Sequence, residues 1–92
     1  MKSIQKEIHE TNVEKGWWEG YPRNEDGTVV MTADQILAKL ALVHSEVSEA
    51  LEDARVGAMK TTFEANGKPV GFPSELADVV IRVMDLSHAL GI

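Results

Sequence analysis

The chain has 92 residues, a formal net charge of −6 and no cysteine, which excludes disulfides, thiolate zinc sites and cysteine nucleophiles. Its negative charge argues against nucleic-acid polymers and anionic membranes as partners, because both bind basic surfaces, and no segment resembles a signal sequence or a bilayer span, which favours a cytoplasmic protein. A chain this short has a thin core, so we expect one domain over residues 1–92 and a core completed by oligomerisation.

The first predicted element is a helix over residues 3–15. This segment lacks glycine and proline, carries isoleucines at helical spacing, and precedes Gly16, a residue type that commonly ends helices. Trp17 and Trp18 follow at once. One or both tryptophans could anchor this helix on the core, or one could stack on a flat ligand such as a nucleotide base.

Turn-forming residues are dense from residue 19 to residue 31, so we expect a loop there, with at most a brief extended piece and no partner strand. A second helix follows this loop. Thr32 and Gln35 have the spacing of a capping box, in which each side chain bonds the backbone N–H of the other residue. Helical periodicity then extends to about Val56, before Gly57.

The second helix carries an apolar stripe and a polar strip along one flank of that stripe, when its residues are placed about 100° apart. The predicted core stripe consists of Ile36, Leu40, Val43, Val47, Ala50 and Ala54. The flanking strip consists of Lys39, Leu42, Glu46, Glu49 and Asp53. The glutamates of this strip therefore lie where a second helix packed on the stripe would meet its edge.

A second loop is predicted over residues 57–72, followed by a third helix from Pro73, which suits a first helical turn, to about Leu90. The core stripe of this helix consists of Leu76, Val79, Val80, Val83 and Leu90, and its flank of Glu75, Arg82 and Leu86, with Asp78 slightly farther round. Ile81 and Met84 lie off the stripe, so we expect the helix to pack on more than one side. The sequence thus predicts an all-α fold, a small antiparallel bundle of three main helices per chain.

Two pairs of carboxylates, each spaced one helical turn apart, occur on the second and third helices: Glu46 with Glu49, and Glu75 with Asp78. A pair at this spacing lies on one side of its helix, and one pair alone would be an ordinary solvated face. Two pairs on antiparallel neighbours would form an oxygen-rich cluster whose mutual repulsion requires cations. Magnesium, or manganese as a substitute, prefers oxygen ligands, so these four residues are candidate metal ligands.

The three histidines do not fit a di-iron bundle, which needs Glu-x-x-His on the metal-facing side. Asp85 and His88 have the nearest spacing but project to the back of their helix, and His9 and His44 lie away from both acidic pairs. We therefore expect structural or surface histidines and oxygen-only ligation, which favours magnesium.

Two segments around these carboxylates resemble the MazG-like all-α nucleotide pyrophosphohydrolases. Residues 39–52, KLALVHSEVSEALE, are similar to the first metal helix of that family, and residues 67–82, GKPVGFPSELADVVIR, to the second, including the Gly-Phe-Pro lead-in. The resemblance covers nearly the whole chain and implies an all-α dimer or dimer of dimers. It also implies magnesium-dependent cleavage between the α and β phosphates of a nucleoside or deoxynucleoside triphosphate. The products would be nucleoside monophosphate and pyrophosphate, and a house-cleaning role against aberrant nucleotides is an extrapolation from this activity.

The resemblance also implies which residues carry the reaction. The magnesium ligands would be Glu46, Glu49, Glu75 and Asp78. One of the first pair, Glu49 rather than Glu46, would orient or deprotonate the attacking water. Lys39 is the first candidate for the contact with the triphosphate, because it lies two turns before Glu46 on the same flank. Weaker candidates, each of which could equally be solvated surface, are Lys60, Lys68 and Arg82, and either Trp18 or Phe72 could line a base pocket or belong to the core.

Two other classes of function stay open. The chain could be a catalytically silent helical interaction module that keeps its acidic pairs as surface charge, or a non-catalytic protein that binds a metal or a nucleotide. The family usually continues into a fourth helix that helps to hold phosphates, whereas this sequence ends at Ile92. A neighbouring subunit would supply that wall, or the segment lies outside this sequence, or the activity is reduced.

Overall fold

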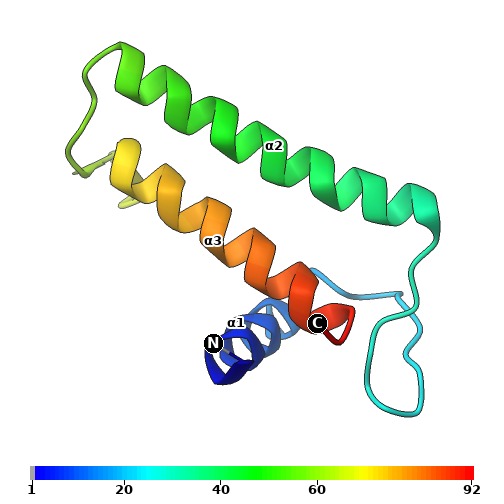
Figure 1. The fold of residues 1–92 in the computed structure, drawn as a ribbon. Helices are drawn as coiled ribbons and strands as arrows, with labels where there is room; N and C mark the ends of the chain where they lie inside the picture. The colour runs from blue at the N-terminus through cyan, green and yellow to red at the C-terminus, as the bar shows by residue number, and fades with distance from the viewer. Residues whose placement is uncertain (1) are drawn as a thin grey trace.

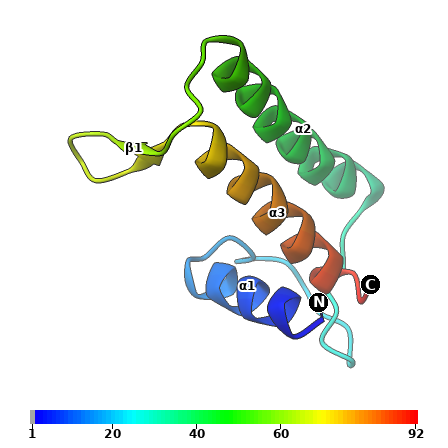
Figure 2. The same ribbon diagram turned by 60° about the vertical axis from the view of Figure 1, so that its left-hand side comes forward.

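The computed structural model describes residues 2–92 as three helices and one short hairpin. The helices are α1 (Lys2–Glu14), α2 (Ala33–Arg55) and α3 (Phe72–Ala89), and strand β1 (Thr62–Phe63) pairs antiparallel with β2 (Pro69–Val70). α2 and α3 lie side by side and antiparallel, and α1 packs on the other side of α3 (Figure 1). The hairpin projects from the body between α2 and α3 (Figure 2). The all-α prediction is therefore confirmed, although the loop predicted over residues 57–72 contains this hairpin.

The helix ends follow the local signals in the sequence. Thr32 forms the predicted capping box, since its side chain accepts from the Gln35 N–H at 3.1 Å and the Gln35 side chain accepts from the Thr32 N–H at 2.9 Å. α1 ends at Glu14, and the chain turns at Gly16, whose φ of 85° favours glycine, while the Trp17 N–H donates back to the Asn12 carbonyl. Because the chain turns sharply here, the side chains of Trp17 and Trp18 point in different directions. No helix within residues 2–92 has the length and apolar character needed to cross a membrane.

The junction between the hairpin and α3 is fixed by Gly71. This residue has a φ of 112°, and a Cβ on it would lie 2.3 Å from the carbonyl oxygen of Lys60. The next backbone N–H, that of Phe72, donates to the carbonyl of Ala58 at 2.9 Å. The hairpin is thus held against the start of α3 by backbone contacts that leave no room for a larger residue.

The apolar core lies near the carboxyl end of α3. Trp18, Val29 and Ala89 are buried there, and Tyr21, Met31 and Leu86 pack against them. Within residues 2–92 the extended piece at 29–31 pairs with no strand, but Val29 makes an isolated bridge with Arg23 and its N–H donates to the Ala89 carbonyl. The loop after α1 therefore covers the end of α3.

Asp85 joins α1 and the following loop to α3 through a buried polar network. Its carboxylate accepts from Asn12 Nδ2 at 2.8 Å and from Trp18 Nε1 at 2.9 Å, and it lies 2.6 Å from Nδ1 of His9. The other ring nitrogen of His9 lies 3.1 Å from Nη2 of Arg23. Because a guanidinium only donates, that nitrogen accepts, which places the ring proton on Nδ1 and makes His9 a donor to Asp85. The prediction that Asp85 projects to the back of its helix is wrong, whereas His9 is structural as expected.

The predicted core stripes are only partly correct. On α2, Ala50 is buried, but Leu40 and Val47 are 50% and 49% exposed, and the polar flank residues Glu46 and Lys39 are half-buried instead. The other exposed residues of the core stripes predicted on α2 and α3 are Ala54, Leu76, Val80 and Val83. α2 is therefore rotated so that its polar flank, not the centre of its apolar stripe, faces α3. Both helices keep a second apolar face that nothing in residues 2–92 covers.

We expect Asp85→Ala to lower the free energy of unfolding by about 3 kcal/mol, because it leaves three buried donors without an acceptor. Urea unfolding followed by circular dichroism measures this loss. Glu10→Ala is the control, since Glu10 makes only an exposed ion pair with Lys6 and should change stability by less than about 0.5 kcal/mol. Equal stabilities of the two variants would contradict the structural role of Asp85.

Candidate functional site

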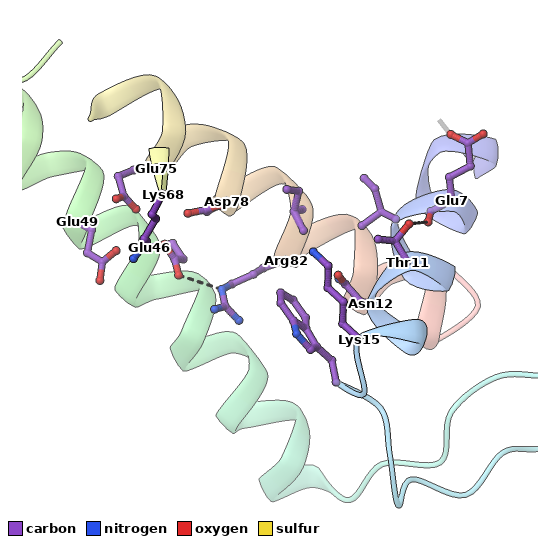
Figure 3. A pocket seen from close by; sticks show the side chains of 13 residues that line it. Glu7, Thr11, Asn12, Lys15, Glu46, Glu49, Lys68, Glu75, Asp78 and Arg82 are labelled. Carbon is purple, nitrogen blue, oxygen red and sulfur yellow. Dashed lines mark hydrogen bonds and ion pairs between the residues drawn. The ribbon is translucent and has the colours of Figure 1, made fainter. Parts of the chain in front are cut away.

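A pocket of ≈ 640 Å³ lies between α1 and the α2–α3 pair, with the hairpin at one end (Figure 3). This volume is ordinary for a small-molecule site. α1 and the residues after it contribute Glu7, Ile8, Thr11, Asn12, Lys15 and Trp17. The other walls contribute Glu46 and Glu49 from α2, Lys68 from the hairpin, and Glu75, Asp78, Ile81 and Arg82 from α3. All four carboxylates predicted as metal ligands therefore line one pocket.

The carboxylates meet because α2 and α3 are antiparallel neighbours with their polar flanks in contact. Glu46, Glu75 and Asp78 each present an oxygen, and these three oxygens lie within 4.8 Å of one another. The Oε2 atoms of Glu46 and Glu75 are buried and have no hydrogen-bond partner in the part of the chain that the structure describes. Buried carboxylate oxygens without partners are costly, so this end of the pocket suits an incoming donor or cation.

The crowding of the carboxylates raises the proton affinity of Glu75. Burial raises the pKa of Glu75 to about 7, and hydrogen bonding and charge repulsion from Glu49 and Glu46 add to this effect. Burial and the charge of Glu46 also raise the pKa of Asp78, while Arg82 and Lys68 act in the opposite direction. Without a bound cation, the cluster therefore retains a proton near neutral pH.

Arg82 links the acidic end of the pocket to its aromatic wall. Its Nε donates to Oε1 of Glu46 at 3.1 Å (Figure 3), and its guanidinium carbon lies 5.5 Å from the centre of the Trp17 ring. The Lys15 ammonium lies 5.9 Å from the same ring. Cations and an exposed indole thus adjoin the carboxylates in one continuous pocket.

Several residues predicted to bind substrate lie outside this pocket. Trp18 is 5% exposed and belongs to the core, and the Lys39 ammonium lies 4.3 Å from the centre of its ring, with burial lowering the pKa of Lys39. Lys60 is exposed in the loop before β1, and Phe72 is half-buried at the first turn of α3. Of the predicted contacts with the triphosphate, the structure places Arg82 and Lys68 on the wall of the pocket.

The structure distinguishes the two tryptophans and adds Lys15 and Asn12, which the sequence did not single out. Trp17, not Trp18, lines the pocket, together with Lys15 and Asn12 from the end of α1. Lys68, a weaker candidate in the sequence, lies on the wall beside the carboxylates (Figure 3). The available signal was Gly16, because a glycine at the end of a helix marks a turn that changes the direction of the residues after it.

The donor set fits a hard divalent cation better than any softer metal. Among residues 2–92 it consists only of carboxylate oxygens, two of them buried without partners, and contains neither sulfur nor imidazole. The cationic wall of Lys15, Lys68 and Arg82 suits an anionic ligand that reaches the same cluster.

Comparison of the chain with protein-family models, with curated proteins and with solved structures finds no match. The likeness to the MazG-like enzymes therefore stays a prediction, and function has to be inferred from the pocket.

In the presence of a chelator, we expect the protein to lose stability as the pH rises from about 5 to about 8, because Glu75 binds its proton more tightly when folded. The ordinary pKa of Glu75 is 4.5 and its folded pKa is about 7, so its contribution is complete below 4.5 and is lost as the pH passes through 7. Glu75→Gln removes this titration and should unfold at temperatures that depend less on pH. Thermal unfolding in chelator at several pH values tests this, with Glu52→Gln as the control. Equal pH dependence in wild type and Glu75→Gln would show that this proton does not matter.

Proposed function

We propose that this chain is a magnesium-dependent nucleoside triphosphate pyrophosphohydrolase, which converts a nucleoside or deoxynucleoside triphosphate into the monophosphate and pyrophosphate. The observation that carries this proposal is the content of one pocket, in which unpartnered carboxylate oxygens adjoin three cationic side chains and an exposed tryptophan. The likeness of residues 39–52 and 67–82 to the MazG-like enzymes supports it. A cytoplasmic location fits a substrate that is made and consumed there.

Glu46, Glu75 and Asp78 would hold the magnesium, with Glu49 beside them. When bound, the ion supplies charge neutralisation at the phosphate oxygens. Binding would also replace the proton that Glu75 otherwise retains, since the two compete for the same oxygens. With the cation bound, the repulsion among these carboxylates would no longer destabilise the fold.

The cationic residues are placed to bind the phosphates. Arg82 donates to Glu46 through Nε alone, and a guanidinium has four further N–H groups that can donate to phosphate oxygens. Lys68 from the hairpin and Lys15 from the end of α1 lie on the wall of the same pocket. The triphosphate would thus lie between the carboxylates and Trp17, with the base against the indole ring.

The reaction is an in-line displacement at the α-phosphorus. A water oxygen forms a bond to that phosphorus, the bond from phosphorus to the bridging oxygen breaks, and pyrophosphate leaves with the electron pair. Glu49 accepts the proton of the attacking water, since it is the most exposed of the four carboxylates and lies outside the group of three that are in close contact. Arg82 and Lys68 stabilise the charge that develops on the phosphates.

We expect Glu49→Gln and Asp78→Asn each to lower magnesium-dependent turnover by at least about 100-fold, because one removes the base and the other a metal ligand. The assay measures pyrophosphate released from a panel of standard and modified nucleoside and deoxynucleoside triphosphates, with magnesium and with chelator. Glu52→Gln is the matched control, since Glu52 lies on the same helix but makes only an exposed ion pair with Arg55.

The two outcomes that would count against this proposal are distinct. If no nucleotide shows metal-dependent turnover, the enzyme assignment is wrong, and the chain is a non-catalytic binding protein or an interaction module. Full activity in both Glu49→Gln and Asp78→Asn, with turnover in the wild type, would show that other carboxylates do the chemistry. Circular dichroism of each variant confirms that its helices are intact.

We expect Trp17→Ala to raise KM by roughly tenfold with little effect on kcat, because a lost base–indole stack weakens substrate and transition state alike. The Trp17 side chain is 40% exposed, so its removal should leave folding stability almost unchanged. Trp18→Phe is the contrasting variant: it removes the hydrogen bond to Asp85 and should lower stability instead. Steady-state kinetics and urea unfolding together separate the two. A KM effect confined to Trp18→Phe would contradict the assignment of Trp17.

A further inference from the structure

Asn12 is almost completely buried and still lines the pocket. It is 2% exposed, and its side chain extends from α1 toward α3 (Figure 3). Nδ2 of its amide group donates to Oδ2 of Asp85 at 2.8 Å, whereas Oδ1 accepts no hydrogen bond from the residues that the structure describes. Within residues 2–92, the fully enclosed side-chain oxygens that lack a partner belong to Glu46 and Glu75. Oδ1 of Asn12 is therefore an unpaired acceptor at the surface of the pocket.

Asp85 fixes the orientation of this amide group. Turning the amide over would bring Oδ1 of Asn12 against the carboxylate of Asp85, and two acceptors cannot form a hydrogen bond. Asp85 also accepts from His9 and Trp18, so its own position is held from three sides. Asn12 therefore presents an oxygen to the pocket and cannot exchange it for the NH₂ group, as an asparagine in solvent would.

The side chains beside Asn12 on α1 are acceptors as well. The Thr11 hydroxyl donates its hydrogen to the carbonyl of Glu7 at 2.9 Å, which leaves only lone pairs for a ligand. The carboxylate of Glu7 lines the same wall and, when ionised, only accepts. Lys15 is a donor on this wall, and its ammonium lies 5.9 Å from the centre of the Trp17 ring. The part of α1 before Lys15 thus favours a ligand that brings N–H groups.

Asn12 is joined to the tryptophan on which the base would stack. The backbone N–H of Trp17 donates to the carbonyl of Asn12 at 3.1 Å, so one turn of the chain carries both side chains into the pocket. Along α3, Asp85 follows the pocket residue Asp78 by seven residues, or about 10 Å of helix. A nucleotide whose phosphates lie at the carboxylates and whose base lies on Trp17 therefore directs an edge of that base toward Asn12.

The bases differ in what that edge offers. Cytosine and adenine carry an exocyclic amino group, which donates, whereas uracil, thymine and hypoxanthine carry a carbonyl oxygen at the same position, which only accepts. An amino group there donates to Oδ1 of Asn12. A carbonyl oxygen leaves Oδ1 unpaired and sets two acceptors against each other. A site with a buried polar group discriminates against a ligand that cannot pair with it.

We propose that Asn12 determines the base specificity of this site and selects nucleotides whose base carries an exocyclic amino group at position 4 of a pyrimidine or position 6 of a purine. The inference rests on the proposed function, because that function places the base of a nucleoside triphosphate on Trp17. Its consequence is that dCTP and dATP bind more tightly than their deaminated counterparts, dUTP and dITP. A house-cleaning role against deaminated nucleotides would not fit this selectivity.

The test measures binding to the wild-type protein of nucleotides that cannot be cleaved. The α,β-imido analogues of dCTP, dUTP, dATP and dITP carry nitrogen in place of the bridging oxygen, so that binding in magnesium is measured without turnover. Isothermal titration calorimetry should give a dissociation constant at least about tenfold lower for the amino member of each pair, dCTP against dUTP and dATP against dITP. Equal affinities within the pairs, or tighter binding of the carbonyl members, would overturn the inference.

Failure of this inference differs from failure of the proposed function. Equal binding of all four analogues, together with turnover of the cleavable nucleotides, would overturn only the role of Asn12. If none of the four analogues binds, both the proposed function and the role of Asn12 are wrong.

Comparison of Asn12→Ala with Trp18→Phe assigns the selectivity to one side chain. Each variant removes one donor to Asp85, but only Asn12→Ala removes an acceptor from the pocket. We expect Asn12→Ala to bind the members of each pair within about twofold of each other, and Trp18→Phe to keep the preference of the wild type. A preference that Asn12→Ala retains, or that both variants lose, would contradict the role of Asn12. The wild-type comparison decides the question even if Asn12→Ala does not fold.

Discussion

The carboxylate of Asp85 holds the two parts of the structure together. α2 and α3 pack on each other through their flanks, but α1 and the loop after it are fixed to α3 by the donors of His9, Asn12 and Trp18. A buried carboxylate is tolerated only when its oxygens are satisfied, so these three residues and Asp85 depend on one another. This contact fixes α1 on α3, and residues of α1 and of the acidic flank of α2 line the same pocket.

α3 carries two carboxylates, Asp85 and Glu75, that differ in how their oxygens are hydrogen-bonded. Asp85 has three donors, whereas an oxygen of Glu75, ten residues earlier, is buried with none. The first arrangement stabilises the fold, and the second weakens it until a proton or a cation arrives. Arg82 lies between them in sequence and compensates only one oxygen of Glu46. The difference in hydrogen bonding therefore separates a structural carboxylate from candidates for binding.

The sequence was sufficient for the helices and for the carboxylate cluster, because both depend on local spacing. Glycines and the Thr32 capping box mark the helix ends, and pairs one turn apart on neighbouring helices must converge. It did not decide between Trp17 and Trp18, because adjacent residues diverge and only the turn at Gly16 orients them. It also misplaced the buried side of α2, since periodicity identifies an apolar face but not which neighbour covers it. The sequence placed Lys39 at the phosphates because it assigned the wrong side of α2 to the core.

The hydrogen bonds that attach α1 have a consequence for how the chain folds. They join residues separated by 76, 73 and 67 positions in the sequence, whereas only residues 56–71 separate α2 from α3. Contacts between distant segments form late, because the chain between them must first give up its freedom. We therefore expect α2 and α3 to associate early and α1 to dock last. The pocket would then be the final part of the molecule to take shape, and a nascent chain would acquire its ligand site only once its two ends had met.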